Sequence, residues 1–347
     1  MANRTPWRSA LLVFLACLSS LVRADPPASQ PAAVREAFLK IIDRPRVDPA
    51  PEEQPPVTLA PGLDEIQFSY ATDAQQRVPG LLVKQSATTG RRPTVIMMHG
   101  TGGKKEGELG LLKQYAGKGF IAVAIDGRYH GERAKYGEYN AQIAHAFAEG
   151  GEHPLYYDTV WDAMRLIDYL QSRPDVDPAR IGLMGFSKGG IETYFTAAVD
   201  PRVAVAVPCI GVQSFGWALE HDGWHGRVGT FSKAFTASFK QAGLDHADAA
   251  FVRRFYDRVV PGIYDQFDGP VMLTLITPRP LLVINGGSDD KTPVEGVQLC
   301  AAAAEKAYTA ANAADHFRDI IEPNTGHQVT KESGAIALEW FEKWLGS

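Results

Sequence analysis

The sequence predicts an α/β protein with a doubly wound, mostly parallel sheet and a helical insertion. Short apolar runs alternate along the 347 residues with segments whose apolar side chains recur every three to four positions, as strands and helices do around a parallel sheet. Several runs are almost continuously apolar, as expected for strands covered on both faces. Residues 212–275 lack a strand pattern but carry many aromatic residues, which favours a helical insertion over a loop.

The chain begins with a segment typical of a secretory signal peptide. Two arginines precede the apolar run ALLVFLACL, and Val22 and Ala24 occupy the positions before a cleavage site. The run is too short to span a bilayer. We therefore expect residues 1–24 to be removed on export, leaving a secreted or periplasmic protein without a membrane span. A lipid anchor on Cys17 is a weaker alternative, because Cys17 lies inside the apolar run.

A proline-rich segment, residues 25–61, follows the leader. Proline lacks a backbone donor and favours extended structure, so this segment is expected to be a linker or an arm lying over the domain. Within it, AVREAFLKII (residues 33–42) has the pattern of one short helix. The main folded domain is then expected to span residues 62–347.

Strands and helices are predicted in alternation through this domain. The strand candidates are residues 66–71, 80–84, 93–100, 120–126, 180–187, 203–211, 279–286 and 317–323. Helices are predicted at 155–173, 188–199 and 331–347, with apolar faces formed by Val160, Met164 and Ile167, by Ile191, Phe195 and Ala198, and by Ile336, Trp340 and Trp344. The insertion precedes the strand at 279–286, which leads to a pair of acidic residues.

Charge and ligand patterns narrow the classes of partner. The formal net charge is −5, without the basic face that nucleic acid requires, so a small-molecule partner is expected. His221 and His225 are spaced for a zinc site, but the glutamate of H-E-x-x-H and further ligands are missing. Neither a metal nor an organic cofactor is expected. Cys209 and Cys300 lie in apolar surroundings and are expected to be buried thiols; whether they ever pair stays open.

The stretch GFSKG fits G-x-S-x-G, the motif of a nucleophile elbow. In such an elbow a serine occupies a strained turn between a strand and a helix, and its hydroxyl is exposed at the edge of the sheet. Here RIGLMGF is a strand candidate and KGGIETYFTAAV a helix candidate. The flanking glycines allow strand and helix to approach without Cβ clashes. We therefore predict that Ser187 is a catalytic nucleophile.

A serine hydroxyl needs a general base and a third group that orients the base. Downstream, one apolar strand leads into Asp289 and Asp290, and a later strand leads into His327. Each follows the carboxyl end of a strand, where α/β sheets place their chemistry, and the order Ser, Asp, His is that of the motif. Asp289 is the predicted acid because it follows GGS directly; Asp290 is the alternative.

Acyl transfer also requires two donors for an oxyanion. The backbone amide of Lys188, the residue after the nucleophile, is one candidate. The other is expected in the loop HGTGGKKEG (residues 99–107), where we predict the amide of Thr101. Gly102 and Gly103 would let the backbone approach the substrate. A phosphate-binding loop is the alternative, but the spacing matches neither the P-loop nor G-x-G-x-x-G.

Two further regions are candidates for substrate contact. The segment IDGRYHGER (residues 125–133) carries Arg128 and His130. They either form a hydrogen-bonded network beside the oxyanion loop or bind substrate; Arg128 is our substrate-binding candidate. In the insertion, Trp217 and Trp224 are candidates for roofing the site, although most of its aromatic residues should pack on one another.

From about Leu63 to Leu345 the chain resembles the α/β-hydrolase superfamily, in the branch of dienelactone hydrolases, acetyl xylan esterases and prolyl-oligopeptidase-type catalytic domains. The resemblance is carried by IDGRYHGER, DTVWDAMRLIDYL, DPARIGLMGFSKGG, IGVQSFGWALE and RPLLVINGGSDDKTP, which are similar to segments of hydrolases related to acylaminoacyl peptidases. It implies the α/β-hydrolase fold and a triad of Ser187, Asp289 and His327. The chain has no room for an N-terminal β-propeller, so small esters are expected rather than peptides.

The sequence thus predicts an exported serine esterase that acts through an acyl-enzyme intermediate on a small-molecule ester. Two alternatives keep the triad but change the substrate, to acetyl groups on a polysaccharide or to an acyl-peptide. A third alternative is a ligand-binding protein with this fold, but such proteins typically lose a triad member and this chain keeps all three.

Overall fold

The computed structural model describes residues 31–87 and 89–346. The strands are β1 (Glu52–Glu53), β2 (Val57–Ala60), β3 (Leu63–Ala71), β4 (Arg77–Gln85), β5 (Arg92–Met98), β6 (Ile121–Ile125), β7 (Val176–Phe186), β8 (Val203–Cys209), β9 (Leu281–Gly286) and β10 (Phe317–Glu322). The helices are α1 (Pro31–Ile42), α2 (Leu109–Gly117), α3 (Tyr139–Glu149), α4 (Tyr157–Ser172), α5 (Lys188–Val199), α6 (Phe215–Glu220), α7 (His225–Gly229), α8 (Ser232–Gln241), α9 (Ala249–Val259), α10 (Gly269–Thr274), α11 (Val294–Ala310) and α12 (Lys331–Leu345). The eight predicted strands are confirmed as β3 to β10. The predicted leader lies outside the described residues.

One ten-stranded sheet runs in the order β1-β3-β4-β6-β5-β7-β8-β9-β10, with β2 paired to β3. The pairs β6–β5, β5–β7, β7–β8, β8–β9 and β9–β10 are parallel. The pairs β1–β3, β2–β3, β3–β4 and β4–β6 are antiparallel. This confirms the prediction of a mostly parallel sheet. The chain leaves β5 for β6 on one side and later returns to β7 on the other, so the carboxyl ends of β5 and β7 flank a topological switch point, where such sheets bind ligands.

The register of the parallel strands brings their carboxyl ends level with one another. Met98 at the end of β5 pairs with Gly185 of β7, and Phe186 pairs with Cys209 of β8. At the other end of the parallel block, the last residues of β9 and β10 are also paired. The loops after all of these strands therefore open at one edge of the sheet, although they are far apart in sequence.

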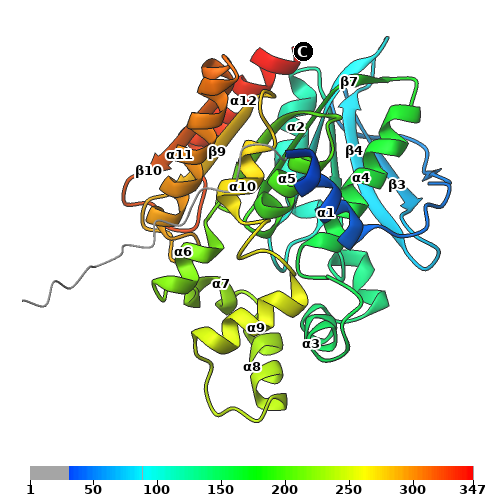
Figure 1. Ribbon diagram of the computed structural model, residues 1–347. Coiled ribbons are helices and arrows are strands. Elements are labelled where there is room, and N and C mark those ends of the chain that lie inside the picture. The colour runs from blue at the N-terminus through cyan, green and yellow to red at the C-terminus, as the bar shows by residue number, and fades with distance from the viewer. Residues whose placement is uncertain (1–30, 88, 347) are drawn as a thin grey trace, which may run out of the picture. The chain divides into compact units, whose positions relative to one another are not determined.

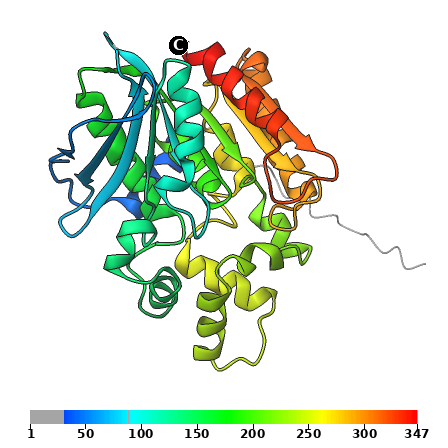
Figure 2. The same ribbon diagram turned by 180° about the vertical axis from the view of Figure 1, so that it is seen from behind.

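Helices cover both faces of the sheet (Figures 1 and 2). On one face, α1, α4, α5 and α11 contribute to the larger buried core; on the other, α2 and α12 close a second core. On α12 the predicted face packs on the second core, with Trp340 buried and Ile336 and Trp344 half-buried against it. The prediction missed that Phe341 and Leu345 are buried in the same core. Gly182 of β7 leaves room for the Phe341 ring, because a Cβ there would lie 2.5 Å from that ring.

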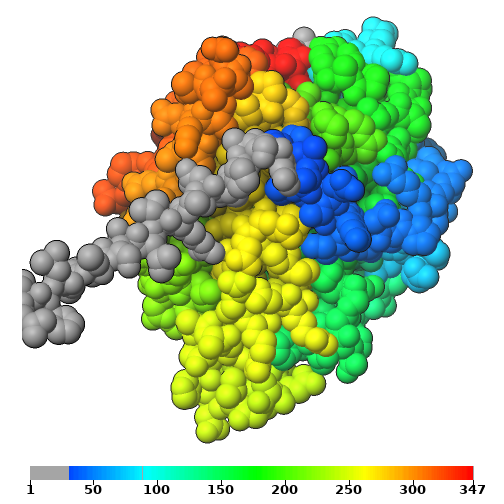
Figure 3. Space-filling view, in the orientation of Figure 1, coloured from blue at the N-terminus to red at the C-terminus, as the bar shows by residue number. Residues whose placement is uncertain are grey.

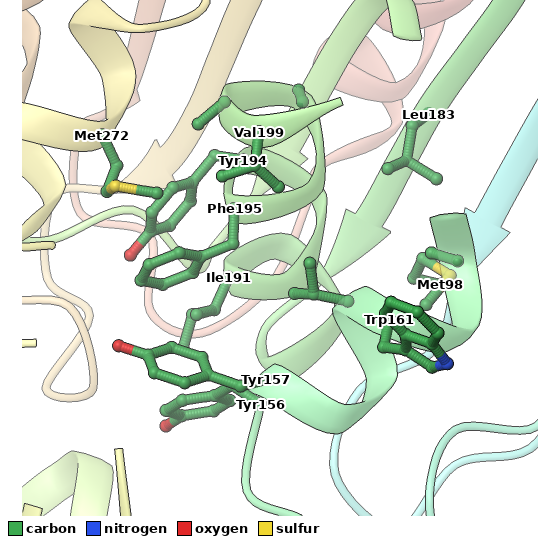
Figure 4. Close-up of a cluster of buried hydrophobic side chains, with 14 of the residues drawn as sticks. Met98, Tyr156, Tyr157, Trp161, Leu183, Ile191, Tyr194, Phe195, Val199 and Met272 are labelled. Carbon is green, nitrogen blue, oxygen red and sulfur yellow. The ribbon is translucent and has the colours of Figure 1, made fainter. Parts of the chain in front are cut away.

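The helix that follows Ser187 is buried on all sides. Every residue of α5 is buried, and Figure 4 shows Ile191 and Phe195 projecting from it toward Tyr157 at the start of α4, with Tyr194 beside Met272. The rings of Phe195 and Tyr157 are 5.3 Å apart, and those of Phe195 and Tyr194 are 4.8 Å apart. Close packing on this scale leaves the start of α5 little freedom.

The described part of the proline-rich segment is integrated into the fold. The predicted short helix is confirmed as α1, and its Phe38 is fully buried against the rings of Tyr157, Phe195 and Phe267. β1 and β2 extend the sheet by pairing with β3. In the space-filling view, the blue segment that begins with α1 lies across the surface of the domain (Figure 3). The compact unit accordingly begins at Pro31, and this segment is an arm rather than a free linker.

The segment between β8 and β9 is helical, as the sequence predicts. Figure 1 shows α7, α8 and α9 gathered beyond one end of the sheet, beside α3. We call α6 to α9 (residues 215–259) the cap. Its aromatic residues pack mainly on one another: Phe235, Phe251 and Phe255 form ring pairs 5.2–6.4 Å apart. α10 packs against α5 and α11 in the layer over the sheet.

None of the helices within residues 31–87 and 89–346 has both the length and the apolar character needed to cross a membrane. Cys209 and Cys300 are buried and free, which confirms the prediction of buried thiols.

Candidate active site

Ser187 lies in a strained turn between β7 and α5. Its backbone has φ 56° and ψ −114°, a left-handed conformation that costs about 1–3 kcal/mol in a residue other than glycine. The neighbouring backbones press on this turn. A Cβ on Gly189 would lie 2.2 Å from the carbonyl oxygen of Met98, and a Cβ on Gly190 would lie 2.4 Å from that of Cys209. The glycines after the serine are therefore required, and the turn is a nucleophile elbow.

His327 connects Ser187 to Asp289. Its Nε2 is 2.7 Å from Ser187 Oγ, and its Nδ1 is 2.6 Å from Asp289 Oδ2. His327 comes from the loop after β10 and Asp289 from the loop after β9, so the level strand ends bring together residues 140 positions apart in sequence. Ser187 is buried, with 8% of the residue exposed. In this arrangement the Nδ1–H donates to the carboxylate and Nε2 accepts from the serine hydroxyl, the tautomer that a general base requires.

The structure distinguishes the two acidic candidates. The Asp289 side chain is fully buried and accepts from His327, from the Lys291 amide at 2.9 Å and from the Thr292 hydroxyl at 2.8 Å. The Asp290 side chain is 73% exposed and pairs with Lys291 Nζ at 2.9 Å. Asp289 is therefore the acid in contact with the histidine, and Asp290 is a surface carboxylate.

Hydrogen bonding keeps Asp289 ionised. Burial alone would raise the pKa of this carboxyl, but the hydrogen bond from His327, together with those from the Lys291 amide and Thr292, lowers the pKa below its ordinary value. A negative charge therefore faces the imidazole ring at neutral pH, where it would stabilise a protonated His327.

The loop after β5 lies against the elbow, as an oxyanion loop should. A Cβ on Gly100 would be 3.5 Å from Ser187 Cβ, so the loop backbone passes directly beside the nucleophile. Half-buried Thr101 follows Gly100. Lys188 is the first residue of α5, and amides of a first helical turn have no partner within the helix. Both predicted oxyanion donors thus belong to segments that border Ser187; their role stays a prediction.

A buried polar network holds the loop after β5 in place. His99 Nε2 accepts from the Gly127 amide at 2.9 Å, so its Nδ1–H donates to the Gly100 carbonyl at 2.8 Å. Burial, followed by the charge of Lys188, lowers the pKa of His99 to about 4 and keeps the ring neutral. Lys105 Nζ is 3.1 Å from the buried Asp126 carboxylate. The loops after β5 and β6 are therefore tied together behind the oxyanion region.

The Lys188 side chain is buried and paired within the protein. Its ammonium forms a buried ion pair with Glu192, one helical turn further along α5. Burial raises the pKa of Glu192, although Lys188 lowers it. The ion pair thus stabilises the first turn of α5.

Arg128 does not reach the site, which corrects its selection as a substrate-binding residue. It is 1% exposed and is held by Asp162 at 3.1 Å and by Asp73 at 2.8 Å. Its donors are occupied by carboxylates from distant parts of the sequence, so the alternative of a structural network is correct. His130 is buried beside it, and burial lowers the pKa of His130 to about 2.

The two candidate tryptophans belong to the cap. Trp217 is half-buried, and its ring is stacked 4.4 Å from that of His221. Trp224 is buried and is 6.2 Å from the Phe235 ring. Their contact with substrate stays a prediction. His225 pairs with Asp222 at 3.2 Å, and no group of three or more His, Cys, Asp or Glu side chains within residues 31–87 and 89–346 is arranged to hold a metal ion.

Sequence reasoning missed one residue of the site. Arg227, on α7 of the cap, is 2% exposed, and its Nη1 donates to Ser187 Oγ at 3.4 Å. α7 comes this close because Gly226 packs on the backbone of the acid loop; a Cβ there would lie 2.1 Å from the Asp290 carbonyl oxygen. An arginine in a helical cap has no pattern that indicates its direction. The only signal was its position after a glycine in HDGWHGR.

Comparisons with known proteins agree with this fold. Residues 46–214 match the family model described as "Acetyl xylan esterase (AXE1)". The protein YtaP of Bacillus subtilis is 27% identical over 286 residues, which cover 79% of this chain and 85% of YtaP. Acetyl esterase Axe7A of Xylanibacter ruminicola is 33% identical over 147 residues, covering 39% of this chain and 33% of Axe7A. The solved acetyl xylan esterase from Paenibacillus sp. R4 has a TM-score of 0.66 at 19% identity, covering 90% of this chain and 93% of that structure.

The ten-stranded sheet and the nucleophile elbow define this chain as an α/β-hydrolase. Within that superfamily, the family match over residues 46–214 and the similar esterases indicate the acetyl xylan esterase branch, and the chain is a carboxylic ester hydrolase. The resemblance found in the sequence is thereby confirmed.

Proposed function

We propose that this esterase works through a Ser187–His327–Asp289 triad and an acyl-enzyme intermediate. The observation that carries the proposal is the unbroken line of hydrogen bonds from Ser187 Oγ through both ring nitrogens of His327 to the Asp289 carboxylate. A strained serine, a histidine ring within hydrogen-bond distance of it and a buried carboxylate with lowered pKa are the three parts that this chemistry needs.

In the first half of the reaction, His327 Nε2 takes the hydroxyl proton while Ser187 Oγ attacks the ester carbonyl carbon. The tetrahedral oxyanion accepts hydrogen bonds from the Lys188 and Thr101 amides. The imidazolium, stabilised by Asp289, then gives its proton to the leaving alkoxide, and the C–O bond of the ester breaks. In the second half, His327 activates a water that cleaves the acyl-enzyme and restores the serine.

The test is hydrolysis of p-nitrophenyl acetate, butyrate and octanoate by the protein and by Ser187→Ala. Removing the nucleophile should lower kcat by about 10⁴-fold or more, on the scale of other serine hydrolase triads. A loss of less than tenfold would contradict the mechanism. The profile across the three acyl lengths measures how long an acyl chain the site accepts.

Small esters are the proposed substrates, and removal of acetyl groups from a polysaccharide is a second candidate. The family match over residues 46–214 favours the second, whereas an acyl-peptide has no comparable support in the described contacts. Acetate release from acetylated xylan and from an acetylated peptide, each compared with p-nitrophenyl acetate by kcat/KM, separates the three. A kcat/KM on xylan far below that on the small ester would leave small esters as the substrates.

We also propose that the protein is exported, from the leader pattern of residues 1–24. The mature protein recovered from outside the cytoplasm should begin at about Asp25, as determined by N-terminal sequencing. A cytoplasmic protein that keeps its leader would contradict the proposal.

A further inference from the structure

Arg227 is a buried cation that lies beside Ser187 and has no counter-ion among the described residues. It is 2% exposed, and within residues 31–87 and 89–346 no carboxylate forms an ion pair with it at 4.0 Å or less. Its Nη2 is buried and has no hydrogen-bond partner. Removing a charge from water without a partner costs several kcal/mol, so this residue is a poor choice for stability alone.

The tyrosines around Arg227 in the described part of the chain do not balance its charge. The hydroxyl groups of Tyr139, Tyr156 and Tyr256 are near enough to feel its charge, but burial raises the pKa of each, so all three are neutral at pH 7. Asp289, the carboxylate of the site, is occupied by His327. The positive charge is therefore open to an anion that arrives with the substrate.

The guanidinium is held in a fixed direction. With its amide oriented to satisfy both groups, buried Gln213 accepts from Arg227 Nε at 3.3 Å and donates to the Lys291 carbonyl at 3.1 Å. Since Nε is turned toward Gln213 and Nη1 toward Ser187 Oγ, the unsatisfied Nη2 is the donor left for a ligand. Two adjacent guanidinium nitrogens form the planar fork that matches a carboxylate.

We propose that the preferred ester carries a free carboxylate close to its ester group, and that Arg227 binds this carboxylate. The inference rests on the proposed function. Acylation bonds the ester carbonyl carbon to Ser187 Oγ. This oxygen is 3.4 Å from Arg227 Nη1. With hydrogen bonds of about 2.8 Å, the carboxylate would lie roughly two to four bonds from that carbon. The transition-state oxyanion is served by the Lys188 and Thr101 amides, which leaves the arginine for a charge present in the substrate itself.

The carboxylate could belong to the acyl part or to the alcohol part, and two matched pairs of esters separate these cases. Methyl hydrogen succinate is compared with methyl pentanoate for the acyl side, and O-acetyl-lactate with isopropyl acetate for the alcohol side. The kcat/KM of each ester is measured at pH 7 by titration of released acid. In at least one pair, the protein should prefer the carboxylate by tenfold or more.

Arg227→Met removes the charge at similar length and should reduce that preference about 10- to 100-fold, the range expected for a charged hydrogen bond. Arg227→Lys keeps the charge but lacks the planar pair of N–H donors, so its preference for the charged ester should lie between those of the unaltered protein and Arg227→Met. The control is Arg254→Met, which removes an exposed positive charge from α9 of the same cap and should leave the preference unchanged. If Arg227→Met does not fold, inhibition of the unaltered protein still tests the idea: succinate should inhibit p-nitrophenyl butyrate hydrolysis more strongly than neutral succinamide.

Two results would overturn the inference. One is equal kcat/KM within both pairs, with succinate no better than succinamide. The other is a parallel loss for charged and neutral esters in Arg227→Met, which would assign the arginine to the oxyanion instead. Both leave the proposed function intact, provided that the neutral esters are cleaved in a Ser187-dependent manner. Failure to cleave any ester would contradict the proposed function first.

Discussion

Exchange of each acid for its amide gives the sharpest test of the site. In Asp289→Asn, the amide oxygen can still accept from the Lys291 amide, now 2.9 Å away. The NH₂ group then faces His327 Nδ1, which is 2.6 Å from the present carboxylate oxygen. An NH₂ group can only donate, so Nδ1 must become an acceptor and the ring proton moves to Nε2. In that tautomer His327 has no lone pair for the Ser187 proton.

The expected loss is large. The same exchange in a serine protease, with geometry retained, lowers kcat by about 10⁴-fold, or about 5 kcal/mol. The matched variant is Asp290→Asn. Its side chain is 73% exposed and pairs with Lys291, and surface pairs of this kind contribute about 0–1 kcal/mol to stability. It should change kcat less than threefold.

The assay is kcat for p-nitrophenyl acetate at pH 7.5, with circular dichroism to verify that both variants are folded. If Asp289→Asn lost less than tenfold, or if Asp290→Asn lost as much, the assignment of the acid from its hydrogen bonds would be refuted.

Two further predictions concern the framework of the site. Gly189→Ala should abolish activity and lower the free energy of unfolding by several kcal/mol, because its Cβ would lie 2.2 Å from the Met98 carbonyl oxygen. The control is Gly110→Ala on α2, which has open space around it and should be neutral or slightly stabilising. Denaturant unfolding of both variants gives the comparison. His99 has a folded pKa of about 4, below its unfolded value, so its contribution is complete above about pH 6.5 and is lost as the pH falls from 6.5 to 4, by up to about 3 kcal/mol. Urea unfolding at pH 7.5 and 4.5 should therefore show a steeper loss in the unaltered protein than in His99→Asn; equal slopes would contradict the buried neutral ring.

The parts predicted correctly from the sequence have local signatures. The elbow was recognisable because glycines, strand and helix lie within one short stretch around Ser187. The main strands were recognisable because several are apolar runs that end in a polar or glycine-rich turn. Even the choice of Asp289 over Asp290 depended on a local position, directly after GGS.

The parts that were missed depend on distant contacts. β1 and β2 are short, their residues are largely exposed, and they form by pairing with β3, so they have no apolar alternation of their own. Arg128 looked available because its partners, Asp73 and Asp162, are far away in sequence. Arg227 looked like any cap residue, because its approach to Ser187 depends on Gly226 meeting the acid loop.

The strained elbow also makes enzymatic activity a reporter of the whole fold. The Ser187 amide donates to the Cys209 carbonyl on β8 at 2.9 Å, while Gly189 presses on the end of β5. The unfavourable backbone of Ser187 persists only while three strands confine it. A partly unfolded chain would relax this turn, and its serine would become an ordinary hydroxyl. Labelling of Ser187 by a fluorophosphonate during refolding would therefore count only molecules whose central sheet is complete.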